Sequence, residues 1–215
     1  MMNAILFDLD GTLLDTLEDL TDSVNYVLNK HGMPERTIDE IRSFIGNGVP
    51  TLIARSVPCD TDSETVKICV AEMMEYYKDH ADIKTRPYDG IMELLDNLKQ
   101  RNIRIAVVTN KAEEAAKILC KAKFGDVLDI VIGDNGKDKL KPAPDNVFRA
   151  LNELKLAKDE VLYVGDSDVD MITAKNAHLR SVGVTWGFRD ENVLRKNGAD
   201  HIINTPLELL NLNNL

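Results

Sequence analysis

The stretch ILFDLDGTLLDT, residues 5–16, decides the fold class, because an apolar strand runs directly into two aspartates and a glycine. Residues 5–7 are all apolar, which is typical of a strand that is covered on both faces in a parallel sheet. Residues i and i+2 of a strand point to the same side, so the carboxylates of Asp8 and Asp10 are predicted to converge. Two carboxylates held close together repel each other unless a cation, a proton or hydrogen bonds compensate. The stretch therefore predicts a parallel sheet with an acidic edge that needs a partner.

The apolar pattern after this strand becomes helical and stays so as far as residue 84. Leu residues and Val residues recur at three- and four-residue steps over 17–28, and Thr37 with Glu40 forms a capping box for a short helix. Further helices are predicted over 49–57 and over about 63–80. Residues 15–84 therefore read as an all-α segment without a strand.

From residue 85 onward, helices and strands alternate along the chain. Strands are predicted at 103–110, 127–133, 160–166, 181–187 and 200–204, with helices at 91–98, 112–122, 145–154, 168–177, near 190–196 and after Thr205. Strands separated by helices form right-handed crossovers in a parallel sheet. We therefore predict a doubly wound, Rossmann-like α/β core from residues 1–14 and 85–215, with an inserted all-α helical cap domain at 15–84.

The composition excludes several classes of protein. A net charge of −10 leaves no basic excess to neutralise phosphates, so no nucleic-acid partner is expected. No apolar run approaches the ~20 residues of a membrane span, so no membrane association is expected. Three cysteines without a C-x-x-C pattern argue against a zinc site or a disulfide framework and favour a reducing, cytoplasmic compartment. The sequence leaves open whether the protein is a monomer or a homodimer.

Polar residues follow the ends of several predicted strands, where ligands bind in open α/β sheets. They are Asp8, Asp10, Thr109, Asn110, Lys141 in the loop KDKLKPAP, Asp166, Asp168 and Asp170. Asp8, Asp10 and Asp166 form an oxygen-rich set that suits Mg²⁺, which would cancel the repulsion between the paired aspartates. The metal, Lys141, the Thr109 hydroxyl and the Asn110 amide would together receive a transferring phosphoryl group.

These residue types predict hydrolysis in two steps. One carboxylate attacks phosphorus and forms an aspartyl-phosphate, which water then breaks down. The second carboxylate protonates the leaving oxygen and later activates the water. A non-catalytic binding or regulatory module is the alternative from another class, and it predicts the loss of Asp8, Asp10 or Lys141, all of which are present.

The motifs FDLDGT, VVTN, KPAP and VGDSDVD together resemble the four motifs of the haloacid dehalogenase superfamily, in order and over essentially the whole chain. The resemblance implies that Asp8 is the nucleophile and Asp10 the general acid/base. It further implies a metal held by Asp8, the backbone carbonyl of Asp10, and Asp166, with Asp170 supporting the metal. Thr109 and Asn110 would bind phosphate oxygens, and Lys141 would neutralise charge around the nucleophile. Asp168 is left open between such a role and that of an acid at a helix start.

Two further segments resemble phosphoglycolate phosphatases, namely IGNGVPTLIARSV in the cap and VGVTWGFRDENVLRKNGADHIINTPLELL at the C-terminal end. Gly46, Asn47 and Gly48 form a polar loop that is predicted to contact the non-phosphate end of the substrate when the cap closes. Arg55 is left open between a partner for a substrate carboxylate and a surface charge.

The sequence as a whole predicts a Mg²⁺-dependent phosphatase of a small phosphomonoester, with 2-phosphoglycolate as the first choice from resemblance. An inorganic pyrophosphatase, a sugar-phosphate phosphatase or a phosphomutase of the same superfamily remains an alternative, because the motifs determine the chemistry at phosphorus and not the leaving group. A dehalogenase has no use for an acid two residues after the nucleophile, so Asp10 disfavours that activity.

Overall fold

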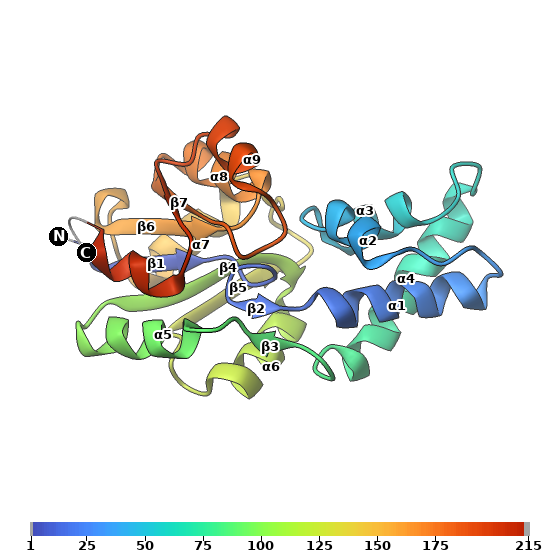
Figure 1. The fold of residues 1–215 in the computed structure, drawn as a ribbon, viewed down its shortest axis with the longest axis horizontal. Helices are drawn as coiled ribbons and strands as arrows, with labels where there is room; N and C mark the ends of the chain where they lie inside the picture. The colour runs from blue at the N-terminus through green and yellow to red at the C-terminus, as the bar shows by residue number, and fades with distance from the viewer. Residues whose placement is uncertain (1, 213–215) are drawn as a thin grey trace. The chain divides into compact units, whose positions relative to one another are not determined.

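The structure is a computed structural model, and it describes residues 2–212 of the chain. The chain divides into two compact units (Figure 1). An α/β unit contains the residues up to Leu14 and those from Pro87 onward, and a helical unit comprises Asp15–Arg86. The helical unit thus extends to Arg86, past the predicted end of the insert at residue 84. Two short strands, β2 (Leu14–Asp15) and β3 (Arg86–Pro87), pair with each other where the chain passes between the units.

The α/β unit is built on a parallel sheet, which within residues 2–212 has six strands in the order β5-β4-β1-β6-β7-β8. Their bounds are β1 Ala4–Phe7, β4 Arg104–Ala112, β5 Ile130–Asp134, β6 Val161–Gly165, β7 Arg180–Val184 and β8 His201–Ile203. The predicted doubly wound parallel sheet is confirmed. Strand β1 lies between β4 and β6, where the strand order reverses, and ligands bind at such a point in open α/β sheets.

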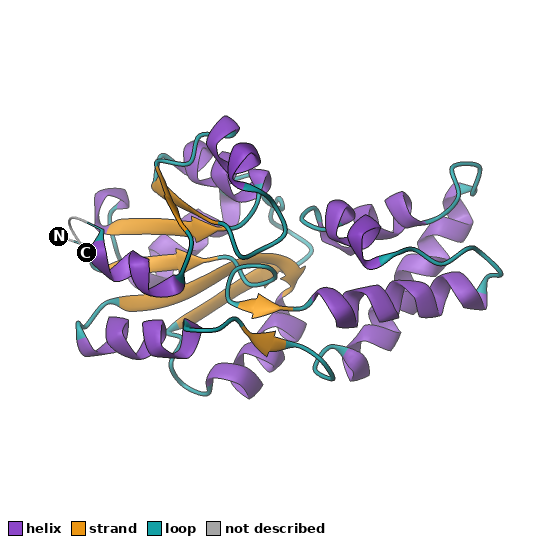
Figure 2. Cartoon of the chain, in the orientation of Figure 1, coloured by secondary structure: helices purple, strands orange, loops and turns teal. Residues whose placement is uncertain are grey.

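Helices cover both faces of this sheet, as Figure 2 shows. Ile5 and Phe7 of β1 pack in one apolar cluster with α5 (Ile91–Gln100), α6 (Glu113–Phe124) and the 3₁₀ helix η2 (Pro206–Asn211). Ala4 and Leu6 face the opposite way and pack with α7 (Asp145–Leu154) and α8 (Asp168–Ala177). This alternation follows from the pleat of the strand, and it buries β1 on both faces at the centre of the core. The remaining elements are η1 (Lys158–Glu160) and α9 (Glu191–Lys196).

The helical unit contains α1 (Leu17–Lys30), α2 (Ile38–Phe44), α3 (Gly48–Ser56) and α4 (Ser63–His80). The capping box of Thr37 and Glu40 is confirmed at the start of α2. The buried Asp19 carboxylate near the start of α1 accepts hydrogen bonds from the backbone N–H groups of residues 83–85. Asp19 therefore fastens the segment that leaves this unit to the helix that enters it. No helix among the described residues combines the length and the apolar character that crossing a membrane requires.

The ends of several predicted elements in the α/β unit differ from the structure. The helix predicted after Thr205 is the short 3₁₀ helix η2, and the Thr205 side chain does not cap it. Strand β4 continues past Asn110 to Ala112, with an irregular register against β5 after Val108. Strand β7 ends at Val184 instead of residue 187, so residues 185–189 are free to form a loop. This last difference matters, because that loop contacts the site described below.

Candidate active site

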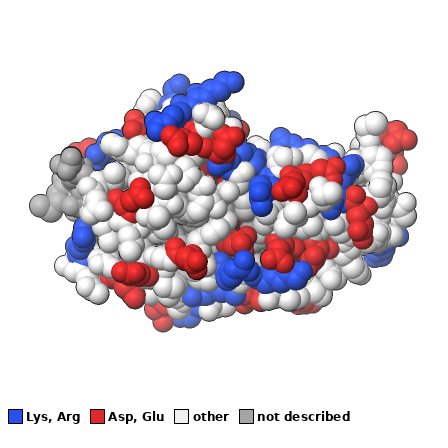
Figure 3. Space-filling model, in the orientation of Figure 1, with Lys and Arg blue, Asp and Glu red and all other residues white. Residues whose placement is uncertain are grey.

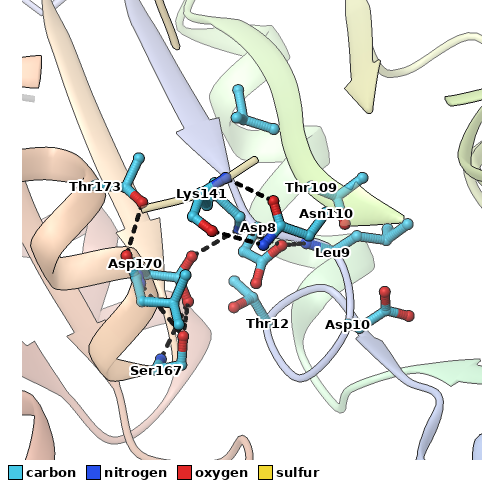
Figure 4. A network of polar contacts seen from close by, with 12 residues as sticks. Asp8, Leu9, Asp10, Thr12, Thr109, Asn110, Lys141, Ser167, Asp170 and Thr173 are labelled. Carbon is cyan, nitrogen blue, oxygen red and sulfur yellow. Dashed lines mark hydrogen bonds and ion pairs between the residues drawn. The ribbon is translucent and has the colours of Figure 1, made fainter. Parts of the chain in front are cut away.

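The side chains predicted from the strand ends gather beyond the carboxyl ends of β1, β4 and β6 (Figure 4). Asp8 directly follows β1, and Asp166 directly follows β6. Lys141 lies in the loop before α7, and Asp170 lies in the first turn of α8. All four come from the α/β unit, so the position of this cluster follows from the sheet alone.

Three carboxylates form a buried acidic cluster. One oxygen each from Asp8, Asp166 and Asp170 lies within 4.8 Å of the others, and all three residues are buried. The ammonium of Lys141 lies 2.8 Å from Asp8 Oδ1 and 2.8 Å from Asp170 Oδ1. One cation facing three carboxylates leaves an excess of negative formal charge, so the cluster favours binding of a proton or a further cation.

The proton affinities of these groups reflect that excess. Burial, reinforced by the charge of Asp170, raises the pKa of Asp8 well above its usual value, although Lys141 opposes the effect. Burial and the same neighbour raise the pKa of Asp166 to about 7. Burial alone would lower the pKa of Lys141, but the charges of Asp170 and Asp8 outweigh it and raise that pKa. Lys141 therefore stays charged, while Asp8 and Asp166 resist simultaneous ionisation unless a cation is bound.

Asp166 is held on all sides by backbone and side-chain groups. Its Oδ1 accepts a hydrogen bond from the Thr12 hydroxyl at 3.1 Å, and its Oδ2 accepts one from the Phe188 backbone N–H at 2.7 Å. A Cβ on Gly11, whose φ is +91°, would lie 2.4 Å from Asp166 Oδ2. A Cβ on Gly187 would lie 2.3 Å from Asp166 Cβ. Glycine is therefore required at both positions for the backbone to approach this carboxylate.

Asp170 anchors Lys141 from the other side. Its Oδ1 lies 2.8 Å from the Lys141 ammonium and 3.2 Å from the Tyr163 hydroxyl. Its Oδ2 accepts hydrogen bonds from the Ser167 backbone N–H at 3.1 Å and the Ser167 hydroxyl at 2.6 Å. A carboxylate has about four lone-pair positions, and four donors lie around this one. Asp170 is thus held firmly in place, and it fixes the position of the lysine.

Asn110 clamps the backbone of the loop that carries Lys141. The Asn110 side-chain amide donates to the Lys141 carbonyl at 3.0 Å, and its Oδ1 accepts from the Lys141 backbone N–H at 2.8 Å. The structure therefore gives the Asn110 side chain a positioning role, whereas its contact with phosphate stays a prediction. The buried Thr109 hydroxyl lies beside it and accepts a hydrogen bond from the Lys111 backbone N–H at 3.2 Å.

The Asp10 carboxylate does not join the acidic cluster. Asp10 Oδ1 forms an ion pair with the Lys111 ammonium at 2.9 Å, and Figure 4 shows the Asp10 carboxylate set apart from Asp8, Lys141 and Asp170. The expected convergence of the carboxylates of Asp8 and Asp10 is therefore wrong. The reason is that β1 ends at Phe7, so the two-residue alternation of a strand does not extend to the aspartates.

The candidates outside this cluster have other partners or lie elsewhere. Asp168 is half exposed and lies 3.5 Å from the Arg189 Nε, so it faces a cation instead of the acidic cluster. In the helical unit, the Arg55 guanidinium donates to the Phe44 carbonyl at the end of α2, which favours the surface interpretation.

The predicted substrate loop also lies in the helical unit. Gly46 and Asn47 lie between α2 and α3, Gly48 is the first residue of α3, and both glycines have a positive φ. Their predicted contact with substrate stays a prediction.

Several residues around the site were not predicted from the sequence. Lys111 follows the VVTN motif directly, and its position at a strand end is a signal that could have identified it. Tyr163 is inside an apolar strand, and nothing local indicates that its hydroxyl reaches Asp170. The predicted strand at 181–187 includes Gly187 and ends before Phe188, so the sequence does not indicate that either residue approaches Asp166.

Comparison with known proteins identifies the family. The model of the haloacid dehalogenase-like hydrolase family matches residues 5–184. The chain belongs to the haloacid dehalogenase-like hydrolase family. The match extends from the first residues of β1 to the end of β7, and the resemblance inferred from the four motifs is confirmed.

Individual relatives are similar over nearly the full length. A phosphoglycolate phosphatase from Neisseria meningitidis serogroup A is 34% identical over 203 residues, covering 92% of this chain and 86% of that protein. The protein PpaX from Caldanaerobacter subterraneus subsp. tengcongensis is named as a pyrophosphatase. It is 32% identical over 212 residues, covering 98% of this chain and 94% of that protein. A crystal structure of a protein from Lactobacillus delbrueckii subsp. bulgaricus is 33% identical, with a TM-score of 0.91 over 96% of each chain.

Proposed function

We propose that this protein is a Mg²⁺-dependent phosphatase that hydrolyses a small phosphomonoester through an aspartyl-phosphate on Asp8, with 2-phosphoglycolate as the first candidate substrate. The observation that carries the proposal is the buried Asp8 at the centre of the sheet, paired with Lys141 and lying within one acidic cluster. Relatives named phosphoglycolate phosphatase, at 34% identity in the example above, support both the hydrolysis of phosphate esters and the choice of substrate.

The donor set fits Mg²⁺. Hard divalent cations prefer carboxylate oxygens, and Asp8 and Asp166 offer them in a place where burial, reinforced by the charge of Asp170, raises their pKa values. When bound, the ion would neutralise charge on the phosphoryl group and keep both carboxylates ionised. Asp8, Asp166 and the carbonyl of Asp10 are the proposed ligands. The four donors around Asp170 favour a supporting role, in which its charge and its contact with Lys141 complete the site.

The contacts of Asp8 support different tasks for its two oxygens. Oδ1 accepts a hydrogen bond from the Leu9 backbone N–H at 2.7 Å and contacts the Lys141 ammonium at 2.8 Å. We therefore assign Oδ2 to the attack on phosphorus. As the bond from Oδ2 to phosphorus forms, the bond from phosphorus to the ester oxygen breaks. Lys141 neutralises negative charge around Asp8 during this step.

Asp10 is the proposed general acid and base. It would give a proton to the departing ester oxygen in the first step and take one from water in the second. Its separation from the acidic cluster in the structure suits this role, because a proton-transfer group has to face the leaving group and not the metal.

Phosphate recognition is assigned to the end of β4 and the loop before α7. The Thr109 hydroxyl would donate to a phosphate oxygen, and Asn110 would act both there and through its clamp on the Lys141 backbone. Acidic and basic side chains are interspersed on the face in Figure 3, and the absence of a nucleic-acid partner stays a prediction. We further propose a reducing, cytoplasmic compartment, since Cys59, Cys69 and Cys120 are all free thiols.

Inorganic pyrophosphatase is the second candidate activity, because PpaX is 32% identical over nearly the whole chain. The same nucleophile and the same charged groups would serve it, with phosphate as the leaving group. The two activities therefore differ only in what recognises the part of the substrate beyond the phosphoryl group.

The test is phosphate release from a panel of small phosphate esters and pyrophosphate, measured with Mg²⁺ and with EDTA. The proposal expects Mg²⁺-dependent turnover with the highest kcat/KM for 2-phosphoglycolate. A higher value for pyrophosphate or a hexose phosphate would keep the chemistry and replace the substrate. A folded, Mg²⁺-loaded protein that releases phosphate from no compound would contradict the proposal and favour a binding module.

A further inference from the structure

A lysine that no part of the proposed mechanism uses lies against the general acid/base. The Lys111 ammonium contacts Asp10 Oδ1 at 2.9 Å, and the side chains of the two residues are only 7% and 16% exposed. The Lys99–Asp129 pair of the same unit, at 3.1 Å, is 38% and 28% exposed. Exposed pairs contribute little, whereas a pair shielded from water fixes the geometry of both groups. The burial of Lys111 therefore gives it a defined position.

The pair joins two neighbouring strand ends. Lys111 lies near the end of β4, directly after Thr109 and Asn110, and Asp10 lies in the loop that follows β1. Strands β1 and β4 are hydrogen-bonded neighbours, so the ion pair holds the loop of the general acid against the phosphate-binding strand. The ammonium occupies Oδ1 of Asp10, which leaves Oδ2 as the oxygen for proton transfer.

We propose that Lys111 is a positioning residue, which fixes the orientation of the Asp10 carboxylate and thereby sets the efficiency of proton transfer to the leaving group. This inference rests on the proposed function. In the first step the Oδ2–H bond of Asp10 breaks and its proton goes to the ester oxygen, while that oxygen leaves phosphorus and Asp8 takes its place. In the second step water attacks phosphorus, Asp10 Oδ2 takes the water proton, and the bond to Asp8 breaks.

The test compares two leaving groups in kcat/KM, which reports the reaction up to the first phosphoryl transfer. An alkyl ester such as 2-phosphoglycolate needs a proton on its leaving oxygen, whereas 4-nitrophenyl phosphate releases a stable phenolate without one. Without Lys111 the Asp10 carboxylate rotates freely, and small misplacements of a catalytic group cost up to about 100-fold in rate. Lys111→Met should lower kcat/KM for the alkyl ester about 10- to 100-fold and leave the aryl ester within about 3-fold.

Three further variants separate positioning from other effects. Lys111→Arg retains a cation and should recover most of the alkyl activity. Asp10→Asn should show the same dependence on the leaving group. The double variant Asp10→Asn/Lys111→Met should have lost no more kcat/KM than Asp10→Asn alone, because the effects of a residue that acts only through another do not add to those of that other residue. Lys99→Met removes the matched exposed pair and should change neither ester. If Lys111→Met does not fold, Lys111→Gln replaces it in every comparison.

The outcomes distinguish this inference from the proposed function. Mg²⁺-dependent turnover by the wild type, with the expected selectivity in Lys111→Met, supports both. An equal fall for both esters, a loss that adds to that of Asp10→Asn, or unchanged kinetics in Lys111→Met would overturn the positioning role while the phosphatase stands. A wild type without turnover of any ester would overturn both.

Discussion

Asp166→Asn should make the metal-free protein more stable while it abolishes activity. The substitution replaces a buried carboxylate with a neutral amide of the same shape. Burial and the neighbouring Asp170 raise the pKa of Asp166 from 3.8 to about 7, so its ionised form is costly at pH 8. The gap between these values corresponds to roughly 4 kcal/mol of free energy of unfolding. That value already includes the opposing effect of the hydrogen bonds from Phe188 and Thr12, so the variant should gain about 4 kcal/mol at pH 8.

The surroundings of Asp166 can accept an asparagine. The Phe188 backbone N–H requires an acceptor, which the amide oxygen provides. The amide nitrogen then faces the Thr12 hydroxyl, which now donates to Asp166 but can rotate to accept instead. The Phe188 N–H and the Thr12 hydroxyl therefore both keep a partner after the change.

The pH dependence of this gain has a defined sign. A carboxyl whose pKa is raised in the folded state contributes its full stability below the unfolded value and loses it as the pH rises through the folded value. Without metal, the wild type should therefore lose stability from about pH 4 to about pH 7, and Asp166→Asn should not. The two should unfold alike near pH 4, and at pH 8 the variant should have a Tm about 8–16 °C higher.

The assay is thermal unfolding in EDTA from pH 4 to pH 8, repeated with saturating Mg²⁺. A ligand at 100 times its Kd stabilises by about 2.7 kcal/mol, so Mg²⁺ should raise the Tm of the wild type and leave that of the variant unchanged. Asp126→Asn is the control, because this exposed carboxylate lies outside the site. An Asp166→Asn variant that is less stable than the wild type in EDTA at pH 8 would refute the reasoning from burial and like charge.

Two other substitutions test the structure away from the carboxylates. Gly11→Ala should lower kcat about 100-fold or more, because its Cβ would lie 2.4 Å from Asp166 Oδ2. Gly198→Ala is the control and should keep full activity, because Gly198 has a similar φ of +94° but nothing lies within 4 Å of its Cβ. Equal activity of the two variants would contradict the close approach. Burial raises the pKa of Glu113, but hydrogen bonds from the side chains of Lys117 and Arg149 hold this pKa at about 2. Glu113→Gln should therefore lower the free energy of unfolding at pH 7 by about 1–3 kcal/mol. The difference between the variant and the wild type should disappear as the pH falls from about 4.5 towards 2. Urea unfolding in which the two proteins do not converge in this pH range would contradict the prediction.

Much of the fold could be predicted because the local signals and the tertiary structure agree. The helix at 145–154, the helix at 168–177 and the helix at 63–80 have their predicted bounds in the structure. Their apolar residues follow the helical period. Asp62 and Ser167 cap the helices at 63–80 and 168–177, whereas Pro144 precedes the helix at 145–154 without a side-chain cap. Strand ends were less accurate, because an apolar residue just outside a strand reads like one inside it, as Val127 and Leu128 before β5 show.

The residues of the site could be predicted as a set, but their contacts could not. Asp8, Asp166, Asp170 and Lys141 come together because parallel strands end at the same edge of the sheet. Which carboxylate faces which cation depends on how each loop leaves its strand. Asp10 turns away to Lys111 because β1 ends before it, and no local pattern in the sequence encodes that end.

The most direct test of the central claim is to locate the phosphoryl group on the enzyme. Asp10→Asn is mixed with 4-nitrophenyl phosphate and Mg²⁺ and quenched in acid, and the peptides are analysed by mass spectrometry. The account predicts that the phosphoryl group is on the peptide containing Asp8, and that this phosphorylated peptide accumulates because the water-activating base is missing. It also predicts that Asp8→Asn carries no phosphoryl group and has lost turnover. A phosphoryl group on another residue, or an Asp8→Asn enzyme that keeps more than about a tenth of the wild-type activity, would contradict it.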